Sequence, residues 1–301
     1  MEQSGLDLDD LRAFFLVAET GSFAKAAHRL NSSKSIVSRR VARLEAVLAA
    51  QLLQRSARGT VLTDAGQLYY EQAREALTQL ECAAENLNDS VHDISGTIRL
   101  TGPVYFGATY LAPALCDFMK LYPRVELDVV FSDEKVDLVR EGFDIGVRLG
   151  HLPDSSLSMR TLLTSKRVLV ASSAYLANNP PIHRPEDLSA HRVVHYSGIV
   201  TNDLWRYAFG GEDHQLKIVP HMRSNSAAML MSAVANGVGL TVLPVFVTGP
   251  YLQSGQVLEV LREYDWGVTP VTLLMPQGRS MPKRVRILID FLLLHFNNRI
   301  I

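Results

Sequence analysis

The amino-acid sequence predicts a multidomain protein in which a small all-α domain and a long helix precede a large α/β domain. Apolar residues recur every three or four positions through residues 6–49, which is typical of short amphipathic helices. A proline-free run over residues 64–94 carries apolar residues at heptad spacing. From Gly96 onward, short runs rich in β-branched residues alternate with helical stretches, which favours an α/β fold with mainly parallel strands.

Length and composition indicate an ordinary soluble globular protein. A chain of 301 residues is long enough for two or three domains, and 47% of its residues are hydrophobic. Its two cysteines, Cys82 and Cys116, form no disulfide framework, so a reducing, cytoplasmic setting is expected. The acidic start of the chain lacks the features of a signal peptide, and its apolar runs are too short to cross a membrane.

The N-terminal domain is predicted to contain three helices. The first carries its apolar stripe over residues 8–18 and ends at Gly21, and Ser22 can cap a second helix over residues 23–30. A turn at residues 31–33 then leads to a third helix over residues 34–49, which Ser33 can cap. Two short helices joined by a tight turn describe a helix-turn-helix.

Positive charge is concentrated on this domain. Residues 21–62 contain eight lysines and arginines and one acid, Glu45, for a net charge of +7, whereas the rest of the chain carries −8. Such a cationic patch attracts polyanions, and nucleic acid first among them. The exposed start of the third helix would enter the major groove, where Lys34, Ser35, Ser38 and Arg39 are assigned to base reading. The alternative is a solvated cationic helix face.

A two-stranded wing is expected after the third helix. Short apolar pairs at residues 52–53 and 61–62 flank a turn that carries Arg55 and Arg58, and Thr63 or Asp64 can cap the helix that follows. The arginines are placed to hold backbone phosphate. The residues assigned to DNA binding are Ser22, Ser33, Lys34, Ser35, Ser38, Arg39, Arg43, Arg55, Arg58 and Thr63.

The long helix carries an a/d seam for pairing with another helix. One set of positions, spaced by seven, holds Tyr70, Leu77, Ala84 and Val91, and the set offset by three holds Ala73, Leu80, Leu87 and Ile94. The alternative is that this stripe packs on its own domain.

Residues 11–66 resemble the DNA-binding domain of LysR-type transcriptional regulators. The resemblance rests on an aromatic-rich first helix and on the motifs "GSF..AA..L", "S..VSR....LE", "LL.R" and "LT.AG". Two positions depart from the family pattern, because Lys34 stands where Gln or Arg is usual and Ala49 where Gly commonly ends the third helix.

The resemblance implies a sequence-specific regulator of promoter DNA with three parts. These are a winged helix-turn-helix domain (1–64), a linker or dimerisation helix (65–95) and an effector-binding regulatory domain (96–301). It also implies that the seam is a dimer contact and that dimers assemble further, into tetramers or larger rings. The residues assigned to dimerisation are Leu77, Leu80, Ala84, Leu87 and Val91.

Residues 96–157 also resemble the LysR effector domain, which is similar to periplasmic solute-binding proteins. The resemblance implies two α/β lobes, with lobe I at about 96–166 and 268–301 and lobe II at about 167–267. The residues themselves predict strands at 97–102, 125–131, 143–150, 167–172, 192–197, 217–220, 239–244 and 271–276. They predict helices at 108–122, 134–142, 227–237 and 281–296.

An effector site is expected where strands end, because ligands of open α/β sheets bind outside the carboxyl ends of strands and at helix N-termini. The residues assigned to it are Thr101, Gly102, Pro103, Val104, Tyr105, Phe106, Ser132, Asp133, Arg148, Tyr196, Ser197, Asn225 and Phe246. Together they predict a small organic ligand with a carboxylate, held by amides and Arg148. Each also has a structural alternative, such as a turn for Pro103, a helix cap for Asp133 and the core for Phe106 and Phe246.

Enzyme motifs are missing from the sequence. It contains no GxGxxG, Walker A or GxSxG motif, so we expect no enzyme activity and no cofactor. His191 and His195 have the spacing of a zinc-binding helix, but the valines between them suggest a strand, where they would lie about 13 Å apart. No metal site is therefore assigned, and "GGED" at residues 210–213 is assigned to a turn. The alternative function is an enzyme, or a solute-binding protein without a regulatory role, fused to a DNA-binding module.

Overall fold

The computed structural model describes residues 5–56, 59–85, 94–134, 136–150, 157–198, 203–277 and 280–297. The chain divides into two compact units. The first comprises residues 1–90, 136–142 and 278–283, and the second comprises residues 91–135, 143–277 and 284–301. Among the described residues, no helix has the length and apolar character needed to cross a membrane.

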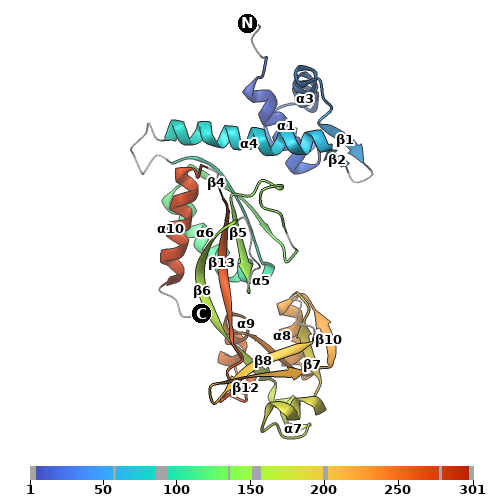
Figure 1. Ribbon diagram of the computed structural model, residues 1–301, viewed down its shortest axis with the longest axis vertical. Coiled ribbons are helices and arrows are strands. Elements are labelled where there is room, and N and C mark those ends of the chain that lie inside the picture. Colours follow the sequence, from blue (N-terminus) through green and yellow to red (C-terminus); the bar gives the residue numbers. More distant parts are fainter. Residues whose placement is uncertain are drawn as a thin grey trace. The chain divides into compact units, whose positions relative to one another are not determined.

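The first unit contains the helix-turn-helix, the wing and the long helix. Its elements are α1 (Leu8–Thr20), α2 (Phe23–Arg29), α3 (Lys34–Leu48), β1 (Leu53–Ser56), β2 (Gly59–Leu62) and α4 (Asp64–Glu85). All but α2 are labelled in Figure 1. Gly21 ends α1 in a left-handed conformation, and the side chains of Ser22 and Ser33 accept hydrogen bonds that cap α2 and α3. The three predicted helices and the two-stranded wing are therefore confirmed.

Small and aromatic side chains fill the core of this unit. Phe14 of α1 is fully buried and belongs to the same cluster as Ala26 of α2 and Val37 and Val41 of α3. The rings of Phe14 and Phe15 also pack on Tyr70 of α4, with ring centroids 6.3 and 5.2 Å apart. The core thus holds the recognition helix and the long helix on one scaffold.

The wing is anchored to the end of α3 and the start of α4. The Glu45 carboxylate accepts hydrogen bonds from the amides of Leu52 and Leu53 at 2.7 and 3.1 Å. A Cβ atom at Gly66 would lie 1.9 Å from the Leu52 carbonyl oxygen, so only glycine lets α4 begin this close to the wing. The one acid of the basic segment therefore has a structural role.

The second unit is built on a twisted mixed sheet. Its described strands pair in the order β10-β7-β11-β6-β13-β5-β3-β4, with β12 added beside β6. Their bounds are β3 (Gly96–Gly102), β4 (Val125–Phe131), β5 (Ile145–Leu149), β6 (Leu157–Ala171), β7 (Val193–Tyr196), β10 (Pro220–Ser224), β11 (Leu240–Pro244), β12 (Leu258–Val260) and β13 (Val268–Pro276). A separate hairpin joins β8 (Leu204–Phe209) to β9 (Glu212–Lys217).

Helices flank the sheet of the second unit. They are α5 (Val104–Phe106), a π-helical turn (Gly107–Leu111), α6 (Ala112–Leu121), α7 (Ser173–Ala177), a 3-10 helix (Pro185–Ala190), α8 (Ala227–Ala235), α9 (Val245–Gln253) and α10 (Lys283–Asn297). The first three form one continuous helical run after β3. Strand–helix alternation within this unit confirms the predicted α/β fold.

Strand β6 divides the unit into two lobes. Residues 157–166 of β6 pair with β13, whereas residues 167–171 pair with β11 and β12. The parallel strands β3, β4 and β5 lie on one side of this change of partner, and the parallel strands β7, β10 and β11 on the other. Figure 1 shows β6 and β13 as the long strands in the middle of the sheet. The predicted two-lobed architecture is confirmed.

Two predicted elements of this part of the chain are wrong. Residues 136–142 form turns and no helix, because the Asp137 side chain accepts hydrogen bonds from the amides of Val139 and Arg140 and Gly142 adopts a positive φ of 70°. The predicted strand at 217–220 spans the end of β9, a loop and the start of β10. The turn assigned to "GGED" is present, since Gly210 and Gly211 both have positive φ between β8 and β9.

Candidate DNA-reading surface and effector site

The start of α3 presents four polar side chains to solvent. Lys34, Ser35, Ser38 and Arg39 are all exposed, and they recur one helical turn apart, whereas Val37 and Val41 of the same helix are buried. Ser33 caps the helix by accepting from the Ile36 amide at 3.3 Å, and its hydroxyl lies 2.9 Å from that of Ser35. The predicted base-reading residues therefore share one accessible helix face.

Two other arginines of α3 point toward the acidic start of α1. Arg40 pairs with Asp9 at 2.7 Å, and Arg43 binds both the buried carboxylate of Asp10 and, at 2.8 Å, that of Asp7. The hydrogen bond to Asp10 raises the pKa of the Arg43 guanidinium. A phosphate contact by Arg43 would have to compete with these bonds, which join α3 to α1.

The wing and the helix caps hold the other predicted phosphate ligands. Arg55 is exposed on β1, opposite Thr60 of β2. Ser22 caps α2, and the Thr63 hydroxyl donates to the Gln51 carbonyl at 2.7 Å while it accepts from the Gly66 amide at 2.9 Å. Arg58 lies outside the described residues.

Only part of the predicted dimer seam lies within the residues that the structure describes. Leu77 is half-buried against the core of the first unit, whereas Leu80, one turn further along α4, has 62% of its surface exposed. The side chain of Ala84, and residues Leu87 and Val91, lie outside what the structure describes.

The ends of β3 and β4 meet in the second unit. The Ser132 amide donates to the Gly102 carbonyl at 2.8 Å, and the Val104 amide donates to the Asp133 carboxylate at 3.0 Å. Thr101 is fully buried beside them, and its hydroxyl has no hydrogen-bond partner within the described residues. The Val104 amide, which the sequence assigns to ligand binding, is thus hydrogen-bonded to the carboxylate of Asp133.

The remaining polar residues assigned to the effector site lie at or near the ends of other strands. Burial raises the pKa of the Tyr196 hydroxyl, and the charge of Asp133 raises it further. Ser197 is exposed, and its amide donates to the Ser224 carbonyl next to exposed Asn225. Arg148 lies on β5, where its guanidinium donates to the Val147 carbonyl at 2.8 Å.

The predicted aromatic ligand contacts belong to the core. Phe106 and Phe246 are fully buried, with ring centroids 5.4 Å apart, and Pro103 and Gly102 are buried as well. Tyr105 is half-buried, and its hydroxyl lies 3.5 Å from the Val247 carbonyl. The structural alternative for the two phenylalanines matches their surroundings.

Comparison with known proteins identifies the family. Residues 8–67 match the family of bacterial regulatory helix-turn-helix proteins of the LysR type, and residues 92–297 match the LysR substrate binding domain. The chain belongs to the LysR family of transcriptional regulators. Like them, it is a sequence-specific DNA-binding regulator whose activity is modulated by a small effector bound in the two-lobed domain.

Relatives of this LysR-type regulator match along nearly its whole length. The regulator PtxR of Pseudomonas aeruginosa is 32% identical over 96% of this chain and 93% of its own, and a Xanthomonas campestris regulator is 34% identical over 97% and 86%. Among solved structures, the full-length virulence activator AphB of Vibrio cholerae is 27% identical with a TM-score of 0.61, covering 97% of this chain and 100% of AphB. CrgA of Neisseria meningitidis is 28% identical with a TM-score of 0.62, at the same coverage.

The two spaced histidines of this LysR-type regulator have other partners. The Tyr175 hydroxyl lies 3.2 Å from Nδ1 of His191, and the Trp205 indole donates to Nδ1 of His195 at 3.3 Å. Burial lowers the pKa of both imidazoles. In the described parts of the chain, no three histidine, cysteine or acidic residues gather as a metal site would require.

Sequence reasoning missed two polar clusters of this regulator. Glu19 contacts Tyr70 and Arg74 between α1 and α4, and the Tyr110 hydroxyl binds the Phe246 carbonyl. The signal for the first was an acid and an arginine on the apolar sides of their helices. The second carried no local signal, because its partners lie 136 residues apart.

Proposed function

We propose that this LysR-type regulator reads promoter DNA through Lys34, Ser35, Ser38 and Arg39 of α3. The observation that supports the proposal is that these four side chains are exposed at the start of α3, while Arg40 and Arg43 of the same helix are bonded to α1. Long donors on such a helix reach guanine O6 and N7, and hydroxyls take either base or phosphate. Arg55 of the wing, together with Arg58, is assigned to backbone phosphate, and Ser22 and Thr63 contact phosphate from the helix caps.

Substitutions at Arg39 and Arg55 separate base reading from phosphate binding. Arg39→Ala should cost about 1–3 kcal/mol on specific DNA and relax preference at one or two base pairs. Arg55→Ala should weaken specific and random duplexes alike and reduce the slope of log affinity against log salt by about 1. Arg206→Ala, at an exposed arginine of β8, is the control. Equal loss on specific and random DNA for Arg39→Ala would remove it from base reading.

We also infer that the effector is a small organic molecule with a carboxylate. Support comes from the Val104 amide, which holds a carboxylate oxygen of Asp133 at 3.0 Å and so offers a position that an effector carboxylate can take over. Thr101 is buried on the strand that leads to this amide, and the charge of Asp133 acts on the Tyr196 hydroxyl. Arg148 on β5 is the cation assigned by the sequence.

A thermal-shift screen of small carboxylates tests this inference. A ligand at about 100 times its Kd adds roughly 2.7 kcal/mol of stability. A stabilising carboxylate should bind more tightly to Asp133→Ala, because the competing side chain is gone, and should lose its effect in Tyr196→Ala and Arg148→Ala. Glu134→Ala, one residue further along, is the control and should bind as the wild type does. An unchanged affinity in Asp133→Ala would show that the Val104 amide is not part of the site.

Assembly follows the family. Members form oligomers, and we propose that two chains pair through α4 and that effector domains join dimers into tetramers or larger rings. The relatives are regulators and not enzymes, and we infer the same for this chain. Because its relatives are DNA-binding regulators, we infer that the protein acts in the cytoplasm.

A further inference from the structure

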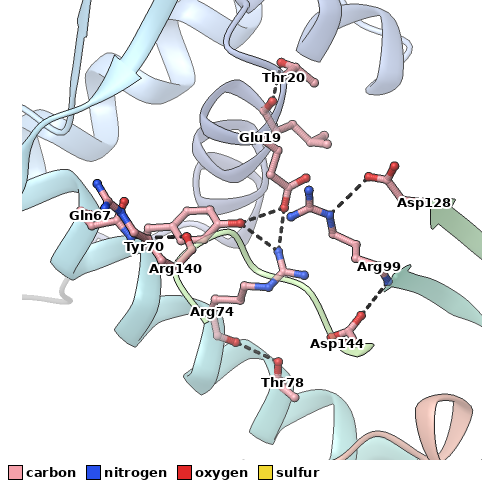
Figure 2. Close-up of polar contacts among 11 residues, drawn as sticks. Glu19, Thr20, Gln67, Tyr70, Arg74, Thr78, Arg99, Asp128, Arg140 and Asp144 are labelled. Atoms are coloured by element: carbon pink, nitrogen blue, oxygen red, sulfur yellow. Dashed lines mark hydrogen bonds and ion pairs between the residues drawn. The ribbon is translucent and has the colours of Figure 1, made fainter. Parts of the chain in front are cut away.

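A buried polar cluster joins the end of α1 to α4. The Glu19 carboxylate accepts from the Arg74 guanidinium at 2.7 Å and from the Tyr70 hydroxyl at 3.1 Å, and Arg74 also donates to the Tyr70 hydroxyl at 3.2 Å (Figure 2). The side chains of Glu19 and Arg74 are only 9% and 20% exposed. Burying such a pair carries a desolvation cost that well-packed apolar residues would avoid, so its net value for stability is small.

Glu19 belongs to the part of the unit that carries the DNA-reading elements. The hydroxyl of the next residue, Thr20, donates to the carbonyls of Leu16 and Ser22, so the end of α1 is tied to the cap of α2. The Gly21 carbonyl accepts from the Thr60 amide of the wing at 2.9 Å. Whatever holds Glu19 therefore holds the helix-turn-helix and the wing as one block.

Tyr70 and Arg74 provide the second attachment of α4 to this block. The first lies at the start of the helix, where the Thr63 amide and hydroxyl bind the carbonyls of Leu52 and Gln51 and Gly66 fits against Leu52. Arg74 follows Gly66 by eight residues, or about 12 Å along the helix axis. A helix attached at one point can change its direction by rotating about that point. Attachment at two points fixes the direction of α4 relative to the helix-turn-helix and the wing.

The hydrogen bonds among Glu19, Tyr70 and Arg74 restrain the orientation of α4 more tightly than the packing of the neighbouring aromatic rings does. Tyr70 also packs edge-on against Phe14 and Phe15, and the hydrophobic part of such contacts is non-directional and tolerates small rotations. A charge-assisted hydrogen bond depends on distance and angle, so it restrains α4 against those rotations.

We propose that Glu19, Tyr70 and Arg74 are positioning residues that set the angle between α4 and the DNA-reading block. In a dimer paired through α4, this angle determines the distance between the two copies of α3, and that distance must match the spacing of the two half-sites. The inference rests on the proposed dimer. It assigns the choice of operator spacing to residues that contact no DNA.

The probe is a duplex selected from random sequence by the wild-type protein. Two kinds of duplex are derived from the selected one. In the first, a series, the distance between half-sites changes by one base pair at a time. The second is a duplex with a single half-site. The wild type should prefer its best spacing over one changed by two base pairs by about tenfold or more. In Arg74→Gln this ratio should fall to about threefold or less, while affinity for the single half-site stays within about twofold of the wild type.

Two further variants make the result specific. Tyr70→Phe keeps the ion pair and removes only the hydroxyl, so it should fold even if Arg74→Gln does not, and its ratio should lie between those of the wild type and Arg74→Gln. Arg40→Gln breaks the Arg40–Asp9 pair between α3 and α1, which is unrelated to α4, and should keep the wild-type ratio.

Three outcomes would overturn the proposal. A wild-type spacing ratio in both Arg74→Gln and Tyr70→Phe would show that the cluster does not set the angle. Equal loss on single and paired half-sites would show that it only stabilises the domain. A wild-type protein without any spacing preference would contradict the dimer itself, which distinguishes that failure from the other two.

Discussion

A single carbonyl oxygen shows how the core of the second unit is satisfied. Pro250 lies inside α9 and has no N–H group, so the Phe246 carbonyl four residues earlier has no helical donor. The Tyr110 hydroxyl donates to this oxygen at 2.6 Å, and the Phe246 amide donates to the Ser165 hydroxyl at 3.4 Å. Phe246 is thereby fixed to the helical run after β3 and to β6, which explains why it is buried.

Tyr110→Phe should destabilise the protein by about 1–3 kcal/mol, because it leaves the buried Phe246 carbonyl without a donor. Urea unfolding measures the change. Tyr105→Phe is the matched control, since the Tyr105 hydroxyl lies 3.5 Å from the Val247 carbonyl. The residue four positions after Val247 in α9 is Tyr251, which, unlike Pro250, has an N–H group that can donate to that carbonyl. Its cost should be smaller, and equal costs would show that Pro250 does not matter.

His195 should make stability depend on pH. Burial lowers the pKa of its imidazole below 6.5, Arg223 and Arg167 lower it further, and Asp203 opposes them. Above pH 6.5 the imidazole is neutral in both the folded and the unfolded chain. As the pH falls from 6.5 through the folded-state pKa, the unfolded chain takes up the proton first, so the free energy of unfolding decreases.

Urea unfolding at about pH 7.5 and about pH 5.5 measures this loss. His195→Gln should reduce it, although His191, whose pKa burial also lowers, contributes with the same sign. His28→Gln, at an exposed histidine of α2, is the control. A pH dependence that His195→Gln leaves unchanged would assign the effect to other groups.

At the scale of elements, the end of α3 carries a strained residue. Ala49 adopts φ 49° and ψ 34° at the C-cap, a left-handed conformation that disfavours any residue with a Cβ. Ala49→Gly should therefore stabilise the protein by about 1 kcal/mol. Ala46→Gly, at an exposed position inside the same helix, should cost about 0.5–1 kcal/mol. Thermal or urea unfolding measures both changes in stability. A loss of stability in Ala49→Gly would contradict the expectation.

Elements with strong local signals could be predicted from the sequence, and those that depend on distant partners could not. Gly21, Ser22 and Ser33 mark helix ends by their own conformational preferences, and the structure places them there. Residues 134–142 have the apolar spacing of a helix, but the Asp137 carboxylate accepts hydrogen bonds from the amides of Val139 and Arg140 and closes turns instead.

The candidate sites follow the same rule. The exposed face of α3 is visible in the sequence because helix periodicity separates it from Val37 and Val41. The partner of Arg43 lies 33 residues away, and the contact between Val104 and Asp133 depends on β3 and β4 lying side by side. Phe106 and Phe246 follow strand ends as ligand residues do, and only tertiary packing shows that they are core.

For the whole molecule, α4 is the element expected to join two chains. Leu80 exposes 62% of its surface on the predicted seam, and Leu80→Asp should place a charge in that apolar contact. We expect monomers in sedimentation that no longer bind a two-half-site operator. Leu68→Asp is a matched control on the same helix, because Leu68 is 59% exposed and lies off the seam. A Leu80→Asp protein that sediments as the wild type would remove this face from the interface.

The position of β13 has a consequence for how the protein is made. The strand lies between β5 and β6 in the sheet, yet its residues, 268–276, are near the end of the chain. When synthesis has reached β12, the strands β3, β4 and β5 therefore cannot yet be joined to β6, because the strand that pairs with both β5 and β6 has not been made. The helices α1 to α4 are complete long before this point. A nascent chain on the ribosome would thus have its helix-turn-helix, wing and α4 complete before the sheet of its effector domain can close. Truncation before Val268 should leave the sheet's exposed edges to aggregate.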